Sequence, residues 1–184
     1  MKKKSIRKLV RKKISIILLL GMMTNIIFAD IKLNPNSKQN TTIDRSQNNA
    51  ATIININTPN ERGISVNEFN EFQTKDPVIF NNFGEGIGRS YLAGLMAANP
   101  NLSREQAAQL ILNRVGGNNR VEIENYLEVM SNGKTDVVFS SPNGYYLNNI
   151  GFINFRDVAF TTANVNLDAN GNLMPFGVRG GDIT

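Results

Sequence analysis

The sequence has 184 residues, with 20 Lys and Arg against 15 Asp and Glu, and a formal charge of +5 is typical of proteins that bind nucleic acid or anionic membranes. Eight of the basic side chains, however, lie within the first 13 residues, and residues 30–184 carry 12 basic and 15 acidic side chains, a net of −3. The charge therefore gives no support for a nucleic-acid partner. The absence of Cys and His excludes disulfides, Cys- or His-liganded metal sites and His-based catalytic triads.

Residues 1–29 have the three parts of a secretory signal peptide. The basic stretch 1–13 precedes an apolar run over 14–23, and Ala29 provides a small residue for signal cleavage. A membrane anchor is the alternative, but a spanning helix needs roughly 18–20 apolar residues and this run is shorter. The leader predicts export across the inner membrane, with cleavage at Ala29.

The next segment, 30–50, is rich in Asn, Ser, Thr and Gln and has few large apolar side chains, so it predicts a mobile mature N-terminus. Strand-like patterns begin at Ala51. Thr52–Asn57 and Gly63–Phe72 are β-branched or nearly alternating, and Val78–Phe80 is a short apolar run.

The middle of the chain is less regular. Gly84–Gly88 lacks the third glycine of a dinucleotide-binding loop and predicts a plain loop, whereas the small apolar residues of Tyr91–Ala98 predict a short helix. Ser103 and Gln106 have the spacing of a helix-capping box, which predicts a helical turn over 103–108. Periodicity alone leaves Leu110–Val115 open between helix and buried strand.

From Val121 onward, short apolar segments alternate with turns that contain Asn-Gly or Pro-Asn-Gly, a pattern that predicts an all-β solenoid, sandwich or barrel. Asn accounts for 28 residues, which favours the solenoid because Asn tolerates left-handed backbone and forms side-chain ladders between stacked coils. The predicted strands are Tyr126–Val129, Asp136–Phe139, Gly151–Asn154, Val158–Thr162 and Leu173–Val178, and the predicted turns are Ser131–Lys134, Ser141–Gly144 and Asp168–Asn172.

Several motifs occur in the order found in one known family. They are Asn55–Phe72, Phe80-Asn-Asn82, Asn99-Pro-Asn-Leu102, Ile111–Val115, Tyr126–Val129, Asp136–Gly144, Gly151–Asn154 and Phe160–Thr162. In this order the chain resembles the N-terminal secretion domain of two-partner secretion exoproteins: filamentous haemagglutinins, large haemolysins and contact-dependent inhibition proteins. Ser141 replaces the first Asn of the second Asn-Pro-Asn motif, and Leu147 and Ile150 stand where one subgroup has a Cys pair.

The resemblance implies a right-handed parallel β-helix with N-terminal capping strands, spanning 51–184 and truncated at its C-terminus. It makes Leu110–Val115 a strand. It also implies a secretion-targeting function: a cognate outer-membrane β-barrel transporter with periplasmic domains would recognise the chain and export it to the cell surface. The chain would meet a membrane only during export, and repeats beyond it would bind host or bacterial cells. Neither a catalytic residue nor a cofactor or metal is expected.

The candidate site residues form two turns, Asn99-Pro100-Asn101-Leu102 and Ser141-Pro142-Asn143-Gly144. Pro fits the second position of a β-turn, and the residue before it accepts a bond from the turn backbone, Ser more weakly than Asn. Both motifs are thus explained as turns that align coils; recognition by the transporter is the alternative.

A β-helix enzyme acting on polysaccharide is a second functional class, and a plain adhesin that shares the secretion domain is a third. The exported protein could also be the delivery arm of a contact-dependent inhibition toxin. By residue type alone, Asp136, Arg156 and Asp157 are the candidates for acid or base catalysis, with a solvated surface as the competing interpretation. The spacing of Asp168, Asn170 and Asn172 resembles the start of a calcium loop, but no Glu closes it.

Overall fold

The computed structural model describes residues 30–174, which form fourteen strands and no helix. The predicted leader, its cleavage position Ala29 and most of the last predicted strand lie outside these residues. The strands are β1 (Asp30–Leu33), β2 (Thr42–Arg45), β3 (Thr52–Asn55), β4 (Ile64–Thr74), β5 (Val78–Asn81), β6 (Ile87–Ser90), β7 (Gly94–Ala97), β8 (Leu110–Val115), β9 (Val121–Ile123), β10 (Tyr126–Met130), β11 (Thr135–Ser140), β12 (Tyr145–Leu147), β13 (Gly151–Ile153) and β14 (Phe155–Thr161).

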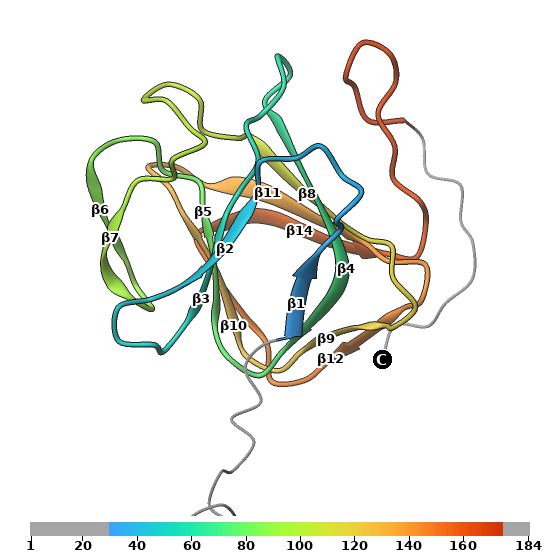
Figure 1. Ribbon diagram of the computed structural model, residues 1–184, viewed down its shortest axis with the longest axis horizontal. Coiled ribbons are helices and arrows are strands. Elements are labelled where there is room, and N and C mark those ends of the chain that lie inside the picture. The colour runs from blue at the N-terminus through green and yellow to red at the C-terminus, as the bar shows by residue number, and fades with distance from the viewer. Residues whose placement is uncertain (1–29, 175–184) are drawn as a thin grey trace, which may run out of the picture.

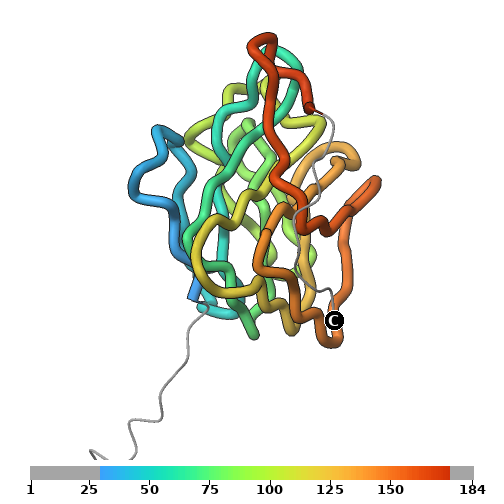
Figure 2. Tube along the Cα trace, turned by 90° about the vertical axis from the view of Figure 1, so that its right-hand side faces the viewer, coloured from blue at the N-terminus to red at the C-terminus, as the bar shows by residue number. Residues whose placement is uncertain are grey.

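Most strands pair in parallel with a strand one coil away. A five-stranded sheet has the order β13-β10-β5-β3-β2, and a seven-stranded sheet has the order β12-β9-β4-β8-β11-β14 with β1 beside β4. Strand β4 bends between two faces, because its first part pairs with β8 and its last two residues pair with β9. The chain therefore winds around one axis, seen end-on in Figure 1, and successive coils follow one another along the molecule in Figure 2. This is the β-helix that the sequence predicts.

The interior of the coil is filled by apolar side chains from every face. Alternation along the strands directs every second residue inward, and the inward set is aliphatic or aromatic. Phe139 lies at the centre of an aromatic cluster, with ring centroids 5.3 Å from Phe72, 6.0 Å from Phe80 and 5.2 Å from Phe160. Since no disulfide is available, this stacked core and the backbone hydrogen bonds hold the coils together.

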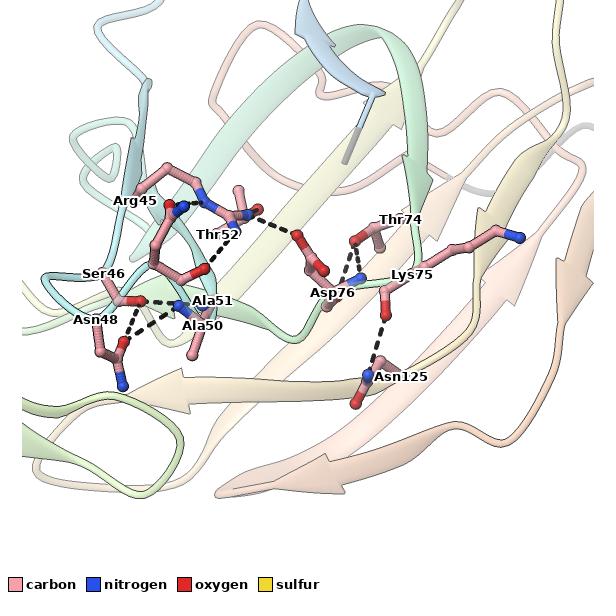
Figure 3. Close-up of polar contacts among 11 residues, drawn as sticks. Arg45, Ser46, Asn48, Ala50, Ala51, Thr52, Thr74, Lys75, Asp76 and Asn125 are labelled. Atoms are coloured by element: carbon pink, nitrogen blue, oxygen red, sulfur yellow. Dashed lines mark hydrogen bonds and ion pairs between the residues drawn. The ribbon is translucent and has the colours of Figure 1, made fainter. Parts of the chain in front are cut away.

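Residues 30–50 form a cap over the first coil, so the prediction of a mobile segment is wrong. Strand β1 runs antiparallel to β4, and β2 runs antiparallel to β3. The segment needs few apolar residues because its polar side chains bond to the coil beneath. The Thr41 hydroxyl donates to Asn67 Oδ1 at 2.8 Å, and Arg45 pairs with Asp76 at 2.8 Å at the corner drawn in Figure 3.

An antiparallel hairpin, β6–β7, lies outside the coil at the left of Figure 1. It replaces the helix predicted over 91–98. Apolar residues of this segment lie on the face of the hairpin that covers the five-stranded sheet. There Met96 packs with Met130 and Ile79 on the outside of that sheet. The helical turn predicted over 103–108 is instead a β-turn, in which the Gln106 amide donates to the Ser103 carbonyl at 3.1 Å.

A second apolar cluster lies outside the coil on the seven-stranded sheet. Leu112 and Val138 on this outer face pack against Val165, and the last described residues continue that cover. Between β8 and β9, the backbone of Gly117 approaches that of Asn70 so closely that a Cβ atom would lie 1.8 Å from the Asn70 carbonyl oxygen. Only glycine fits this corner, because any larger residue would force neighbouring coils apart.

The remaining sequence predictions largely agree with the strands. The three segments predicted between Thr52 and Phe80 and the four predicted between Tyr126 and Thr162 each overlap a strand, and Leu110–Val115 is the strand β8. The Gly84–Gly88 loop is shorter than predicted, because β6 begins at Ile87. Of the last predicted strand, Leu173 forms only an isolated bridge with Leu167. Strands β1, β2, β6, β7, β9 and β12 were not predicted.

Candidate functional site

The first signature turn, Asn99–Leu102, connects the β6–β7 hairpin to the segment that leads into β8. The Leu102 amide donates to the Asn99 carbonyl at 3.1 Å, which closes a β-turn with Pro100 at its second position. Asn99 is buried, and its side chain makes three hydrogen bonds. Its Nδ2 donates to the carbonyls of Ile56 at 2.9 Å and Asn81 at 2.8 Å, and its Oδ1 accepts from the Asn101 amide at 2.9 Å. Asn99 thus joins two successive coils.

Asn101 extends these connections to the cap. Its Nδ2 donates to the Asn40 carbonyl at 2.7 Å and to the Ile56 carbonyl at 3.1 Å, while its own carbonyl accepts from the Thr58 hydroxyl at 2.8 Å. Leu102 is buried in the main core, and Pro100 is exposed. The motif therefore fastens the cap, the first coil and the second coil at one corner.

The second signature turn, Ser141–Gly144, connects β11 to β12. The Gly144 amide donates to the Ser141 carbonyl at 3.2 Å, so this is also a β-turn, and Gly144 has φ of 82°, which favours glycine. The Val121 amide donates to the Gly144 carbonyl at 3.0 Å, and the Asn143 side chain donates to the Gly117 carbonyl. Both contacts are to the preceding coil.

Ser141 behaves differently from the prediction. It is fully buried, and its hydroxyl oxygen has no hydrogen-bond partner among the described residues. The expected side-chain bond to the turn backbone is therefore absent, although the turn itself forms as predicted. The Asn99 carboxamide at the corresponding position of the first turn bonds two carbonyls, whereas the shorter Ser141 hydroxyl bonds none among the described residues.

Tyr145 follows the second turn directly and is buried in the core. Its hydroxyl lies 2.9 Å from the Phe139 carbonyl and 2.7 Å from the Thr161 carbonyl. Burial raises the pKa of this phenol well above its ordinary value, with a smaller opposing effect of the backbone bonds. The neutral phenol therefore persists in the folded protein, and it ties β12 to the two strands above.

Two further side chains hold coils together but were given no role by the sequence. Asn82 Nδ2 donates to the Ala108 carbonyl at 2.9 Å and its Oδ1 accepts from the Ala108 amide at 2.7 Å. Glu128, the only charged side chain among the buried residues of 30–174, accepts from the Ser90 hydroxyl at 2.7 Å and the Tyr91 amide at 2.8 Å. Glu128 thereby anchors the β6–β7 hairpin. In the sequence, the signal for Glu128 was a charged residue between the apolar residues of β10.

The candidate acid and base residues are engaged with each other. Arg156 Nε donates to Asp136 Oδ1 at 2.7 Å, and a second contact makes the pair bidentate. The guanidinium lowers the pKa of the Asp136 carboxyl, chiefly through this hydrogen bond. Such a carboxylate is a poor proton donor near neutral pH. Asp157 lies next to Arg156 in β14 and is exposed.

The Asp168 segment is a self-contained turn. Asp168 Oδ1 accepts from the amides of Asn170 at 2.9 Å and Asn172 at 2.8 Å, and its Oδ2 accepts from Asn172 Nδ2 at 3.0 Å. The carboxylate is thus occupied by the turn that it stabilises. Across residues 30–174, no three acidic side chains gather in a way that could hold a metal ion, and there is no helix of the length and apolarity needed to cross a membrane.

Comparison with known proteins gives a consistent result. The sequence model of the TPS secretion domain matches residues 29–184. The chain is 38% identical over 146 residues to the 16S rRNA endonuclease CdiA of Enterobacter cloacae subsp. cloacae, an alignment that covers 79% of this chain and 4% of the relative. It is 35% identical over 137 residues to the tRNA nuclease CdiA of Escherichia coli O6:K15:H31, which covers 74% of this chain and 4% of that one.

A solved structure agrees with these relatives. The crystal structure of the filamentous hemagglutinin secretion domain superimposes with a TM-score of 0.66 at 28% identity, covering 76% of this chain and 44% of that one. The chain spans only about one twenty-fifth of the CdiA relatives, whose nuclease names describe the whole proteins. The matched family is a secretion domain rather than a catalytic one, and exoproteins that carry it are exported across the outer membrane. The chain belongs to the TPS secretion domain family of two-partner secretion exoproteins.

Proposed function

We propose that this chain directs the export of a large exoprotein of the CdiA or filamentous haemagglutinin type, and that a cognate outer-membrane transporter recognises it through periplasmic domains. The observation that carries the proposal is the match of the TPS secretion domain to residues 29–184, together with CdiA relatives that this chain aligns with over most of its length. The β-helix is compatible with this route. It has no disulfide and is held by parallel strand pairing, so it can be assembled coil by coil after passage of the unfolded chain.

The two signature turns have unequal parts in this proposal. Asn99 and Asn101 satisfy backbone carbonyls of two coils and of the cap, contacts that exist only in the folded domain. In the extended chain the same side chains would be free to bind the transporter. The motif therefore serves as a fastener after export, and we assign recognition before export to the same residues. Pro142 and Asn143 of the second turn would act in recognition in the same way.

The relatives favour one refinement. Because the curated relatives reported above are CdiA nucleases, the exoprotein would be a delivery arm for growth inhibition rather than a plain adhesin. Binding to host or bacterial surfaces would then belong to parts of the exoprotein other than this domain. The polysaccharide-enzyme alternative receives no support from the Asp136–Arg156 pair, which neutralises the candidate carboxylate.

The proposal is tested by expressing the full chain in a Gram-negative host with and without its cognate transporter. We expect the processed chain at the cell surface or in the medium only when the transporter is present, and in the periplasm otherwise. Export that does not depend on the transporter contradicts the proposal. Incubating the purified chain with polysaccharides provides a separate check, because cleavage would restore the enzymatic alternative.

A further inference from the structure

A groove of about 420 Å³ lies between the β6–β7 hairpin and the outer face of the five-stranded sheet. On one side it is lined by β7, including Leu95 and Met96, and on the other by β2 and β3, including Asp44 and Ile53. Pro100, the exposed residue of the first signature turn, also lines it. None of the hydrogen bonds that fasten that turn involves the Pro100 ring, so this residue is available to the groove.

Strand β7 presents an unpaired edge to this groove. Within the described chain β7 pairs only with β6. The Ala98 amide donates to the Gly86 carbonyl at 2.8 Å, so in the antiparallel register the pairs at Leu95 and Ala97 are the non-hydrogen-bonded ones. Their backbone groups therefore point away from β6. Of these, the Ala97 carbonyl accepts from Asn81 Nδ2 at 3.1 Å, which places this edge beside β5. Within residues 30–174, no hydrogen bond is found to the Leu95 amide or carbonyl or to the Ala97 amide.

Asn81 supplies a second, independent sign of a missing partner. Its side chain lines the groove and is 2% exposed, and Nδ2 also contacts Asn55 Oδ1 at 2.8 Å. Its Oδ1, however, accepts no hydrogen bond. A buried carbonyl oxygen without a donor is destabilising and is uncommon in folded proteins. A hydrogen-bond donor from another molecule would remove that cost after a small movement of the lining side chains.

The charges in the groove indicate which sign its partner carries. Arg45 is turned toward Asp76, with which it forms an ion pair at 2.8 Å, as Figure 3 shows. Asp44, its neighbour in β2, accepts only from Asn55 Nδ2 at 3.2 Å, and no Lys or Arg side chain within 30–174 forms an ion pair with it. The uncompensated charge of the groove is therefore negative. The outer side of the hairpin is apolar and exposed, with Ile87 at 73% and Leu95 at 69%.

We propose that this groove binds an extended strand of another protein, which pairs with the free edge of β7. The strand would be about four residues long, to match β7, with apolar side chains at alternate positions against Ile53 and Met96 and a Lys or Arg beside Asp44. Backbone bonds to Leu95 and Ala97 give affinity, and the Asn81 oxygen and the Asp44 carboxylate give direction and selectivity. The exposed Pro100 places this surface next to the first signature turn.

The test uses the peptide acetyl-Val-Lys-Val-Thr-Val-amide and the purified protein, followed by NMR of the backbone amides. We expect shift changes confined to the residues around the groove, 42–55, 79–82 and 93–101. A matched peptide with N-methyl groups on the edge-facing amides should bind at least about tenfold more weakly, since each lost backbone bond costs about 1 kcal/mol. Replacing Lys by Glu in the peptide should also weaken binding, and added salt should reduce that difference.

A variant of the protein provides the reciprocal control. Leu95→Pro removes the amide that faces the groove and leaves the bonds between β6 and β7 in place, so it should abolish binding, whereas Leu95→Val should retain it. If Leu95→Pro fails to fold, the comparison of the N-methylated with the unmethylated peptide still tests whether backbone pairing drives binding. Equal binding of the methylated and unmethylated peptides, shift changes elsewhere, or no binding of any peptide overturns the proposal. So does a concentration-dependent dimer through β7, which would make a second copy of this chain the occupant.

Discussion

The two signature turns have the same backbone geometry but differ in what their first side chain does. Asn99 and Ser141 each begin a β-turn closed by a bond from the fourth residue, at 3.1 and 3.2 Å, and both are buried. Asn99 makes three side-chain bonds that join two coils, whereas the Ser141 hydroxyl has no partner in the described structure. The comparison shows that the turn depends on Pro and on backbone bonds, while the link between coils depends on a carboxamide long enough to reach neighbouring carbonyls.

The largest effect is expected for Asn99→Ala. The change removes three hydrogen bonds and leaves the buried carbonyls of Ile56 and Asn81 without this donor, so we expect a loss of about 3 kcal/mol in the free energy of unfolding. Urea denaturation measures it. Pro100→Ala, at the exposed position of the same turn, is the control and should cost less than about 1 kcal/mol. A loss below that level for Asn99→Ala would contradict the fastening role.

The second turn is expected to be most sensitive at its last residue. Gly144 has φ of 82°, so Gly144→Ala should destabilise the protein by about 1.5 kcal/mol. Gly133→Ala is a suitable control, because an added Cβ there meets no atom within 4 Å and its φ is not positive. Thermal or urea unfolding of the two variants gives the comparison. Equal stability of both would mean that the second turn imposes no backbone constraint.

Tyr145→Phe is expected to cost about 1 kcal/mol at neutral pH, because it removes a buried donor shared by the Phe139 and Thr161 carbonyls. Since burial raises the pKa of this phenol, the folded state holds the proton more tightly than the unfolded state. The stabilisation is therefore fully present below about pH 10, the pKa of an unperturbed Tyr, and declines as the pH rises above it. Between pH 8 and pH 11, the urea concentration at the unfolding midpoint should fall further for the unchanged protein than for the variant. Equal falls would show that Tyr145 does not contribute.

Ser141→Ala should have the smallest effect and the opposite sign. Removing a buried hydroxyl that has no partner should leave stability unchanged or raise it by up to about 1 kcal/mol. The measurement is the same urea titration, with Asn99→Ala beside it. A loss above 1 kcal/mol would show that the Ser141 hydroxyl has a partner, such as a bound water, that makes it equivalent to Asn99.

The sequence predicted the coil strands well, because each combines β-branched or aromatic residues with a turn signal at its end, as in β10 and β11. The sequence-based predictions were wrong for the cap and the hairpin, whose structures depend on contacts between residues far apart in the sequence. The cap was predicted as mobile because its order depends on bonds such as Thr41 to Asn67, across a long sequence separation. The hairpin was predicted as a helix because its short apolar run has no clear period, and the carboxylate that anchors it, Glu128, belongs to another coil.

The candidate turns were also found from the sequence, since Pro-Asn pairs have a specific turn chemistry. The different roles of Asn99 and Ser141 in the two turns were not found from the sequence. Whether a buried side chain reaches a carbonyl on the next coil depends on the spacing of the coils, which no local pattern specifies. The resemblance to the family indicated how these local elements are arranged, as coils of a β-helix. The family match over residues 29–184 confirms the resemblance.

The most direct test of the account is the export of a variant in which Asn99, Pro100 and Asn101 are all replaced by Ala, expressed with the cognate transporter beside Ser141→Ala. The quantity measured is the fraction of chain outside the cell. The account predicts that the triple variant remains in the periplasm or is degraded there, because both its coil fastening and its recognition motif are lost, while Ser141→Ala is exported like the unchanged chain. Normal export of the triple variant would contradict it.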